Sequence, residues 1–239
     1  MKKKTQLLIF PLILMGMLLM LTNSCEKDEK KDDPTPTPTP ANVVKDIDGN
    51  EYHTVKIGTQ IWMAENLKVT KFNDGTAIPL VTDGSAWENL TTPAYCFYDN
   101  IEATYKNTYG ALYNWYTANT GKLSPAGWHV PTDAEWTTLT SYLGGESVAG
   151  GKLKEAGTTH WQSPNTGATN ESGFTALPGG YRYDNTGIFN YIGTYGFWLS
   201  STEESTKYFK FRGAKYQSAG IWNARYSKKG GFSVRCVKD

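Results

Sequence analysis

The chain has little excess charge of either sign, few histidines, few cysteines and no long hydrophobic run. Its 24 Lys and Arg residues nearly balance 23 Asp and Glu residues, which leaves a formal net charge of +1. Beyond the first four residues no basic cluster occurs, so the chain lacks the electrostatic footprint that nucleic-acid phosphates require. We therefore expect no nucleic acid among its partners.

The usual sequence signatures of catalytic and metal sites are also missing. The three histidines, His53, His129 and His160, are far apart, and neither a His-x-x-x-His nor a Cys-x-x-Cys spacing occurs. There is no Gly-x-Ser-x-Gly elbow and no Gly-rich phosphate loop. We expect no catalytic residue, no metal ligand and no cofactor. Calcium is left open without a supporting motif, because the Asp-rich string at residues 46–50 fits a turn better than a calcium loop.

Residues 1–24 have the layout of a lipoprotein signal peptide. Lys2 to Lys4 precede an apolar run from Leu7 to Leu21, which is shorter than the roughly 20 residues of a membrane-spanning helix. The end of the run resembles a bacterial lipobox, in which a small residue precedes a Cys that is acylated and becomes the mature N-terminus. We expect lipidation at Cys25. The alternative is that Cys25 is an ordinary thiol in a signal peptide cleaved nearby.

Residues 25–42 are predicted to form a tether between this anchor and a domain at residues 43–239. Residues 26–33 are charged throughout and residues 34–40 alternate Pro and Thr, a composition that cannot bury apolar surface. The charged cluster after Cys25 also resembles the export signal that carries lipoproteins of Bacteroidetes-type bacteria to the outer face of the outer membrane. The expected location is therefore the outer membrane, lipid-anchored and exposed at the cell surface.

The domain opens with a predicted β-hairpin. Two alternating runs, residues 53–57 and 60–64, flank a Gly58-Thr59 turn. With 13% aromatic residues in the chain, a domain of this length can bury a sizeable core without help from a metal or disulfide.

Helices are predicted over residues 109–118 and after Thr132, where Thr132 and Glu135 form a capping box and Gly144-Gly145 ends the helix. The later part of the domain predicts strands, at residues 197–201, 207–212 and 232–237. The fold class is therefore α+β, with two main helices and short antiparallel strands.

Four strings carry a resemblance to a known family. They are Ile-Trp-Met-Ala-Glu-Asn-Leu at 61–67, Tyr-Gly-Ala-Leu-Tyr-Asn-Trp-Tyr at 109–116, Gly-Trp-His-Val-Pro-Thr-Asp-Ala-Glu-Trp at 127–136, and Gly-Phe-Ser-Val-Arg-Cys-Val at 231–237. Together they resemble the Fibrobacter succinogenes major paralogous domain, found in surface lipoproteins of Bacteroidetes and related bacteria. That family is distantly similar to the formylglycine-generating enzymes and the C-type-lectin-like fold, so the resemblance implies such an architecture. The late pair of active-site cysteines of those enzymes is missing here.

The domain contains two cysteines, Cys96 and Cys236. Export places both in an oxidising compartment, and they are the pair that remains once Cys25 is acylated, so we expect a disulfide between them. Relatives in the family often have Cys where this chain has Ser124. If that Cys is the usual partner of the C-terminal one, Cys236 is free in this chain.

An aromatic binding face is the remaining candidate for a functional site, centred on a loop at residues 179–198. Sugar rings stack on flat aromatic side chains while polar groups bind their hydroxyls. The candidate ligand-binding residues are Tyr181, Arg182, Tyr183, Asp184, Tyr191, Trp198, Trp222 and Arg225. The alternative is that most of these rings belong to the core, where Trp and Tyr are usually buried.

These patterns predict a non-catalytic cell-surface module for adhesion or glycan recognition. A structural or protein-interaction component of the cell envelope is the first alternative, and an enzyme acting on extracellular polymer is the second. The expected partners are membrane lipid at the acylated Cys25 and either a glycan or a surface protein. Rings around a concave groove would favour a glycan, and a flat patch would favour a protein.

Overall fold

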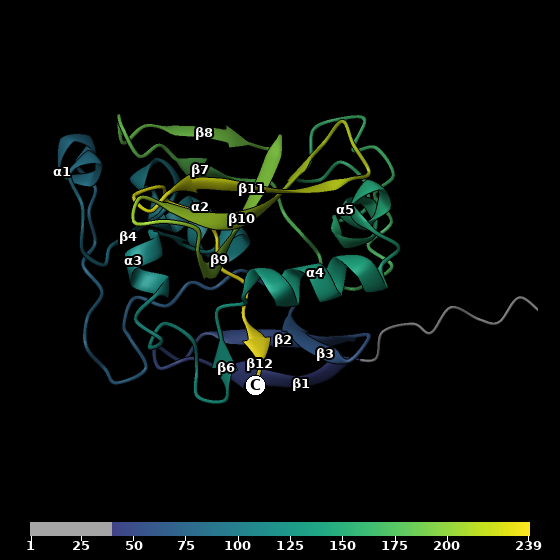
Figure 1. Cartoon of the computed structure of the whole chain (residues 1–239), viewed down its shortest axis with the longest axis horizontal. Coiled ribbons are helices and arrows are strands. Elements are labelled where there is room, and N and C mark those ends of the chain that lie inside the picture. Colours follow the sequence, from purple (N-terminus) through teal and green to yellow (C-terminus); the bar gives the residue numbers. More distant parts are fainter. Residues whose placement is uncertain (1–39) are drawn as a thin grey trace, which may run out of the picture. The chain divides into compact units, whose positions relative to one another are not determined.

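The computed structural model describes residues 40–239, which belong to one compact unit (Figure 1). The predicted signal peptide, Cys25 and the predicted tether up to residue 39 lie outside the described residues. Among residues 40–239, none of the helices is long and apolar enough to span a bilayer.

The first sheet has five strands in the order β1-β2-β3-β12-β6. These strands are β1 (Pro40–Lys45), β2 (Glu51–Ile57), β3 (Gln60–Met63), β12 (Val237–Lys238) and β6 (Trp128–His129). The first and last strands of the described chain therefore share one sheet (Figure 1). Residues 40–42 of the predicted tether belong to β1, and Pro40 is tolerated because the first residue of an edge strand needs no ladder N–H.

The predicted hairpin is confirmed by the pairing of β2 with β3. Ile57 is opposite Gln60 across a two-residue turn, in which Gly58 has a φ of 61°. The preceding turn is held by Asp46, whose carboxylate accepts hydrogen bonds from the Asp48 and Asn50 backbone N–H groups, each 2.9 Å long. Turn chemistry therefore explains this Asp-rich string.

The second sheet has five strands in the order β11-β10-β9-β7-β8. They are β7 (Gly179–Arg182), β8 (Phe189–Ile192), β9 (Tyr195–Glu203), β10 (Tyr208–Lys215) and β11 (Ile221–Ser227). β7 and β9 are parallel, and the other neighbours are antiparallel. The predicted strand at 232–237 is mostly irregular, because Phe232 and Ser233 form only isolated bridges.

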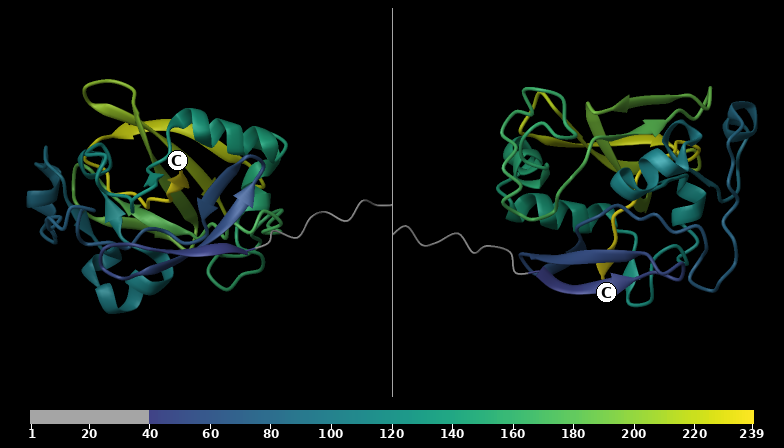
Figure 2. Two further views of the ribbon diagram at one scale, coloured as in Figure 1. Left: turned by 90° about the horizontal axis from the view of Figure 1, so that it is seen from below. Right: turned by 180° about the vertical axis from the view of Figure 1, so that it is seen from behind.

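Helix α4 (Asp133–Tyr142) lies between the two sheets (Figures 1 and 2). Its predicted capping box is present, since the Thr132 side chain accepts from the Glu135 N–H and the Glu135 carboxylate accepts from the Thr132 N–H. Trp136 of α4 packs against Trp62 of the first sheet and Trp198 of the second, with ring centroids 4.8 and 6.4 Å apart. Helix α5 (Glu146–Leu153) follows it and contacts β11.

The predicted helix at 109–118 is wrong. The chain there contains the end of α2 (Glu102–Tyr109), then β5 (Leu112–Tyr113), then the single turn α3 (Trp115–Ala118). Gly110 ends α2 with a φ of 75°, and a Cβ at this position would lie 2.6 Å from the Leu67 carbonyl oxygen. A close tertiary contact therefore breaks the helical pattern.

β5 pairs with β4 (Tyr95–Cys96), and two short helical segments, α1 (Gly84–Glu88) and η1 (Tyr98–Asn100), complete the fold. The described residues form twelve strands and five α-helices. The class is α+β in broad terms, with strands dominating, and the picture of two main helices does not describe it.

Candidate functional site

Trp198 lies in the core and not at a binding face. Its side chain is 1% exposed and packs against Trp136 and Phe174 between the sheets. Its indole N–H donates to Asn66 Oδ1 over 3.0 Å, which satisfies the buried donor. The prediction that Trp198 contacts a ligand is therefore wrong.

Tyr181 is also a core residue, with 6% exposure. Four rings surround it at centroid distances of 4.7 to 5.5 Å: those of Tyr183, Phe197, Tyr226 and Phe232. A ligand cannot reach Tyr181 without displacing one of these neighbours. The prediction that Tyr181 contacts a ligand directly is therefore wrong. Tyr181 instead packs beneath the neighbouring rings and supports them.

Arg182 is 1% exposed and serves as a clamp. Its guanidinium donates to the carbonyl oxygens of Val81, Thr82 and Gly187, and its Cζ lies 4.4 Å from the Trp87 ring centroid. The planar fork is thus bonded on several sides and stacked on an aromatic face, a geometry particular to arginine. The prediction of Arg182 as a ligand contact is wrong, because successive strand residues face opposite ways and this one faces inward beneath α1.

Five aromatic side chains that are at least partly exposed gather on one face of the second sheet, and we call them the aromatic surface. They are Tyr183, Tyr191, Tyr195, Trp222 and Tyr226. Tyr191 is the most open of the five, with 44% exposure. Its ring lies 4.8 Å from that of Tyr195, which in turn lies 6.0 Å from that of Trp222. The predicted Tyr183, Tyr191 and Trp222 are therefore brought together.

The aromatic surface lies on the concave side of a curled sheet. β7 and β11 are separated by β9 and β10 in the strand order, yet the rings of Tyr181 and Tyr226 lie only 5.5 Å apart. Side chains on a flat sheet could not meet across two intervening strands, because neighbouring strands lie about 4.8 Å apart. The sheet therefore curls toward the face that carries these rings.

Trp222 is held flat on the sheet by a glycine. Gly213 is its direct partner across β10 and β11, and a Cβ at Gly213 would lie 2.3 Å from the Trp222 ring. The absence of a side chain there lets the indole lie over the backbone. Tyr195 and Tyr226 are not among the predicted ligand-binding residues. For Tyr226, the alternation of Trp222, Ala224 and Tyr226 along β11 is a signal for one shared face.

The pKa values of Tyr181, Tyr191 and Tyr226 are raised, so these three phenols stay protonated at neutral pH. Burial and the hydroxyls of Tyr183 and Tyr226 raise the pKa of Tyr181 well above its ordinary value. Burial and the Asp184 carboxylate raise the pKa of Tyr226, whose hydroxyl donates to Asp184 Oδ1 over 3.0 Å. The hydroxyl of Tyr183 raises the pKa of Tyr191. The region thus offers protonated phenol hydroxyls and one carboxylate, that of Asp184.

Arg225 does not join this surface. It alternates with the inward Ala224 and Tyr226 on β11, and its guanidinium carbon lies 5.1 Å from the Tyr208 ring centroid and its Nη1 3.9 Å from Glu204. It is exposed on the opposite face of the sheet. The prediction that Arg225 shares a site with the rings is therefore wrong.

The predicted disulfide between Cys96 and Cys236 is not present. Both cysteines are free and buried, in different hydrophobic clusters. Cys236 Sγ has Ser124 Oγ as its polar neighbour at 3.1 Å. Burial raises the pKa of both thiols to about 12, so neither is a reactive thiolate at neutral pH.

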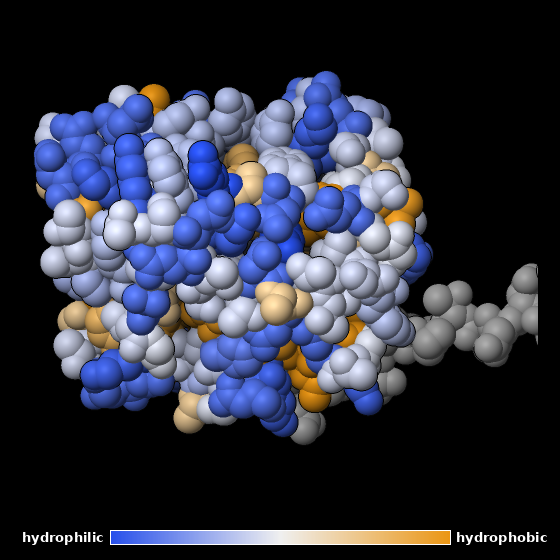
Figure 3. Space-filling model, viewed as in Figure 1, coloured by the Kyte–Doolittle hydropathy of each residue, from blue (hydrophilic) through white to orange (hydrophobic). Residues whose placement is uncertain are grey.

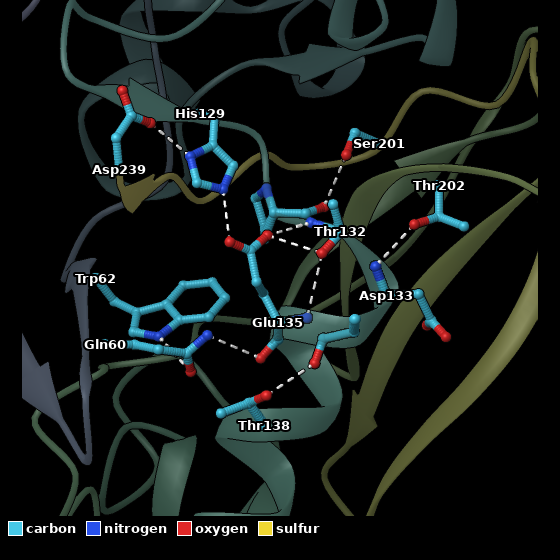
Figure 4. A network of polar contacts seen from close by, with 12 residues as sticks. Gln60, Trp62, His129, Thr132, Asp133, Glu135, Thr138, Ser201, Thr202 and Asp239 are labelled. Carbon is cyan, nitrogen blue, oxygen red and sulfur yellow. Dashed lines mark hydrogen bonds and ion pairs between the residues drawn. The ribbon is translucent and has the colours of Figure 1, made fainter.

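His129 is the centre of a second polar cluster (Figure 4). Its Nδ1 lies 2.6 Å from Asp239 Oδ1 and its Nε2 lies 2.7 Å from Glu135 Oε1. Although partial burial opposes protonation, these two carboxylates raise the pKa of His129 above its ordinary value. Both ring nitrogens are occupied, so the imidazole joins β6, α4 and the C-terminal residue and has no free nitrogen for proton transfer.

A resident metal has no evident place in the described part of the chain. Within residues 40–239, no group of three or more His, Cys, Asp or Glu side chains is arranged to hold a metal ion. The carboxylates around His129 are already engaged with the imidazole and with Thr132.

These features define an α+β domain with two five-stranded sheets and a half-exposed aromatic surface on the curled one. Residues 55–238 match the model of the Fibrobacter succinogenes major domain family, Fib_succ_major. The chain belongs to this family. No curated protein and no solved structure matches the chain significantly.

Proposed function

We propose that this protein is a non-catalytic cell-surface lipoprotein module that recognises glycan through the aromatic surface. The observation that carries the proposal is the gathering of half-exposed rings from separate strands on the concave side of one sheet. The C–H faces of a sugar stack on such rings, and the phenol hydroxyls and Asp184 are suited to its hydroxyl groups.

The chemistry of the aromatic surface favours a glycan over a protein partner. Its rings lie beside phenol hydroxyls and the Asp184 carboxylate, whereas larger contiguous apolar patches mark protein-binding sites. On the face of the molecule in Figure 3, hydrophilic side chains predominate and apolar groups are scattered among them. A structural or protein-binding role in the cell envelope is the alternative outcome of the binding test. We further propose a C-type-lectin-like architecture, which the shared sheet of β1 and β12 supports.

Glycan-array binding tests the proposed function. The full chain carrying Cys25→Ala, which prevents acylation, should bind one or more glycans. Tyr191→Ala and Trp222→Ala should each weaken that binding at least tenfold, because they remove a stacking ring. The matched control is Tyr142→Ala, since Tyr142 is 62% exposed on α4 and lies outside the aromatic surface. Loss of binding in the control alone, or binding to no glycan, would count against the proposal.

The lipid anchor at Cys25 is proposed on the sequence and has its own test. A fatty-acid analogue fed to cells should label the wild-type protein and leave Cys25→Ala unlabelled. The same substitution should release the protein from the membrane fraction, since one acylated residue would carry the whole attachment. Persistent membrane partition of Cys25→Ala would contradict the anchor.

A further inference from the structure

A polar pocket of about 490 Å³ lies directly beside the aromatic surface. It is formed by residues that are far apart in sequence, among them Glu88, Tyr116, Asp184, Asn185, Lys207 and Lys229. Asp184 links the two features, because it lines the pocket and accepts a hydrogen bond from the Tyr226 hydroxyl. The volume is within the usual range for small-ligand sites, about 300 to 1,000 Å³.

The walls of this pocket are tied together by hydrogen bonds between segments that are distant in sequence. The Trp87 indole N–H donates to the Lys229 carbonyl over 2.9 Å, and Lys229 Nζ donates to the Glu88 carbonyl over 2.6 Å. Arg182 joins the turn at Gly187 to residues 81–82 from behind. The pocket is therefore formed before any ligand binds, which lowers the ordering cost of binding.

Close backbone packing fixes the same wall. A Cβ at Gly187 would lie 2.4 Å from the Cα of Gly84, so α1 and the turn between β7 and β8 touch directly. This backbone contact and the hydrogen bonds of Arg182 together hold α1 against the turn.

The polar groups of the pocket balance in charge. Glu88 and Asp184 supply carboxylates, and Lys207 and Lys229 supply ammonium groups. Asp184 accepts from Tyr226 and Lys229 donates to a backbone carbonyl, so these bonds do not join the two side chains to each other. A ligand with a net charge would be attracted by one pair and repelled by the other, so the pocket gives it no net electrostatic advantage. A neutral polyhydroxylated unit can donate to the carboxylates and accept from the ammonium groups in charge-assisted hydrogen bonds.

The aromatic surface and the pocket together extend beyond a single sugar. Trp222 and Tyr226 are four residues apart on β11, which places them about 13 Å apart along the strand. The pocket begins beyond Tyr226, at Ser227 and Lys229. A ligand that uses both must therefore be a chain of several units.

We propose that the pocket is a polar subsite that binds one unit of a neutral oligosaccharide whose other units lie on the aromatic surface. This inference rests on the proposed function and adds the ligand class, an uncharged glycan chain longer than a disaccharide. It also assigns Glu88 and Lys207 as ligand contacts.

Binding of neutral oligosaccharides of two and six units tests the subsite. The probes are the cello-, xylo-, malto- and manno- series, with oligogalacturonate and chitosan oligosaccharides as charged comparisons, and the protein is the full chain with Cys25→Ala. At least one neutral series should bind more tightly at six units than at two. Glu88→Gln and Lys207→Met should each weaken six-unit binding about tenfold and leave two-unit binding unchanged.

Lys210→Met is the matched control, because Lys210 pairs with Glu204 outside the pocket. Wild-type affinity in Glu88→Gln and Lys207→Met, together with loss in Tyr191→Ala, would overturn the subsite and leave the proposed function standing. Tighter binding of a charged series would overturn the neutral ligand class. Binding of none of the probes would overturn the proposed function and the subsite with it.

Discussion

Ser124 Oγ lies 3.1 Å from Cys236 Sγ in the buried core. A cysteine at position 124 would therefore lie beside the Cys236 thiol. Cys96 lies in a different hydrophobic cluster, around Trp87 and Leu112, and is not bonded to Cys236.

Ser124→Cys should form a disulfide with Cys236. The bond would close a loop spanning 112 positions, which stabilises a fold by about 2 to 4 kcal/mol in typical cases. The melting temperature should rise without reductant and return to that of the reduced variant with reductant. Thiol titration of the unfolded variant should count two thiols fewer before reduction than after it. An equal count in both states would contradict the predicted geometry.

Arg182→Lys should destabilise the fold by about 3 kcal/mol, because a lysine cannot satisfy the carbonyl oxygens that the guanidinium fork reaches. Urea denaturation measures the loss. The control is Arg225→Ala, since Arg225 is exposed and its removal should change stability by less than about 0.5 kcal/mol. Equal stability of Arg182→Lys and the wild type would mean that the clamp does not support the fold.

Trp198→Ala should destabilise the fold much more than Tyr191→Ala, because Trp198 is a core residue and Tyr191 lies at the surface. Cutting the buried Trp198 removes its packing and its bond to Asn66, at a cost of about 3 to 5 kcal/mol. Tyr191 is 44% exposed, so its truncation should cost about 1 kcal/mol or less. Thermal unfolding compares the two. A larger loss for Tyr191→Ala would place its ring in the core and remove it from the proposed site.

The contribution of His129 to stability should disappear at alkaline pH. Its pKa is raised above 6.5 in the folded state, so its stabilisation is complete below that value and is lost as the pH rises through the folded pKa. The free energy of unfolding should therefore fall from about pH 5.5 to about pH 8.5 more in the wild type than in His129→Gln.

Asp239→Asn is the companion variant, because it removes one of the two carboxylates that hold the imidazolium. It should reduce the same pH dependence in part. The Glu135 carboxylate contributes to the pH dependence at acidic pH. Burial opposes its ionisation, but its bonds to Thr132 and His129 lower its pKa below the ordinary 4.5. Its stabilisation is therefore lost only as the pH falls below 4.5. Equal pH profiles for wild type and His129→Gln would rule out the cluster as a stabilising ion pair.

Features predicted correctly from the sequence depend on residues close together along the chain. The hairpin around Gly58 and the capping box of Thr132 and Glu135 each use contacts within a few positions. The helix predicted at 109–118 is wrong because the prediction used only the local spacing of apolar residues, whereas tertiary contacts determine the structure of this segment. Gly110 sits against Leu67, and Leu112 pairs with Cys96, so tertiary neighbours converted a helical pattern into a strand.

The residues of the candidate site also differ in whether local sequence or tertiary packing determines their position. Tyr191 and Trp222 were predicted for one binding face and lie on the same aromatic surface, whereas Trp198, Tyr181 and Arg182 are buried and Arg225 lies on the opposite face. The alternation of a strand requires Tyr181 and Arg182 to face opposite ways but does not say which face is covered. That choice depends on α1, which buries Arg182 beneath Trp87, and on Phe232, which covers Tyr181.

The sequence by itself determined the family, the hairpin, the capped helix and the wealth of aromatic rings, because these follow from local spacing and composition. Only the tertiary structure decided which rings remain open to solvent and which charged groups gather in one pocket. The reason is physical: exposure and proximity depend on the curl of the sheet and on the packing of segments such as 84–88 and 183–188, which are distant in sequence.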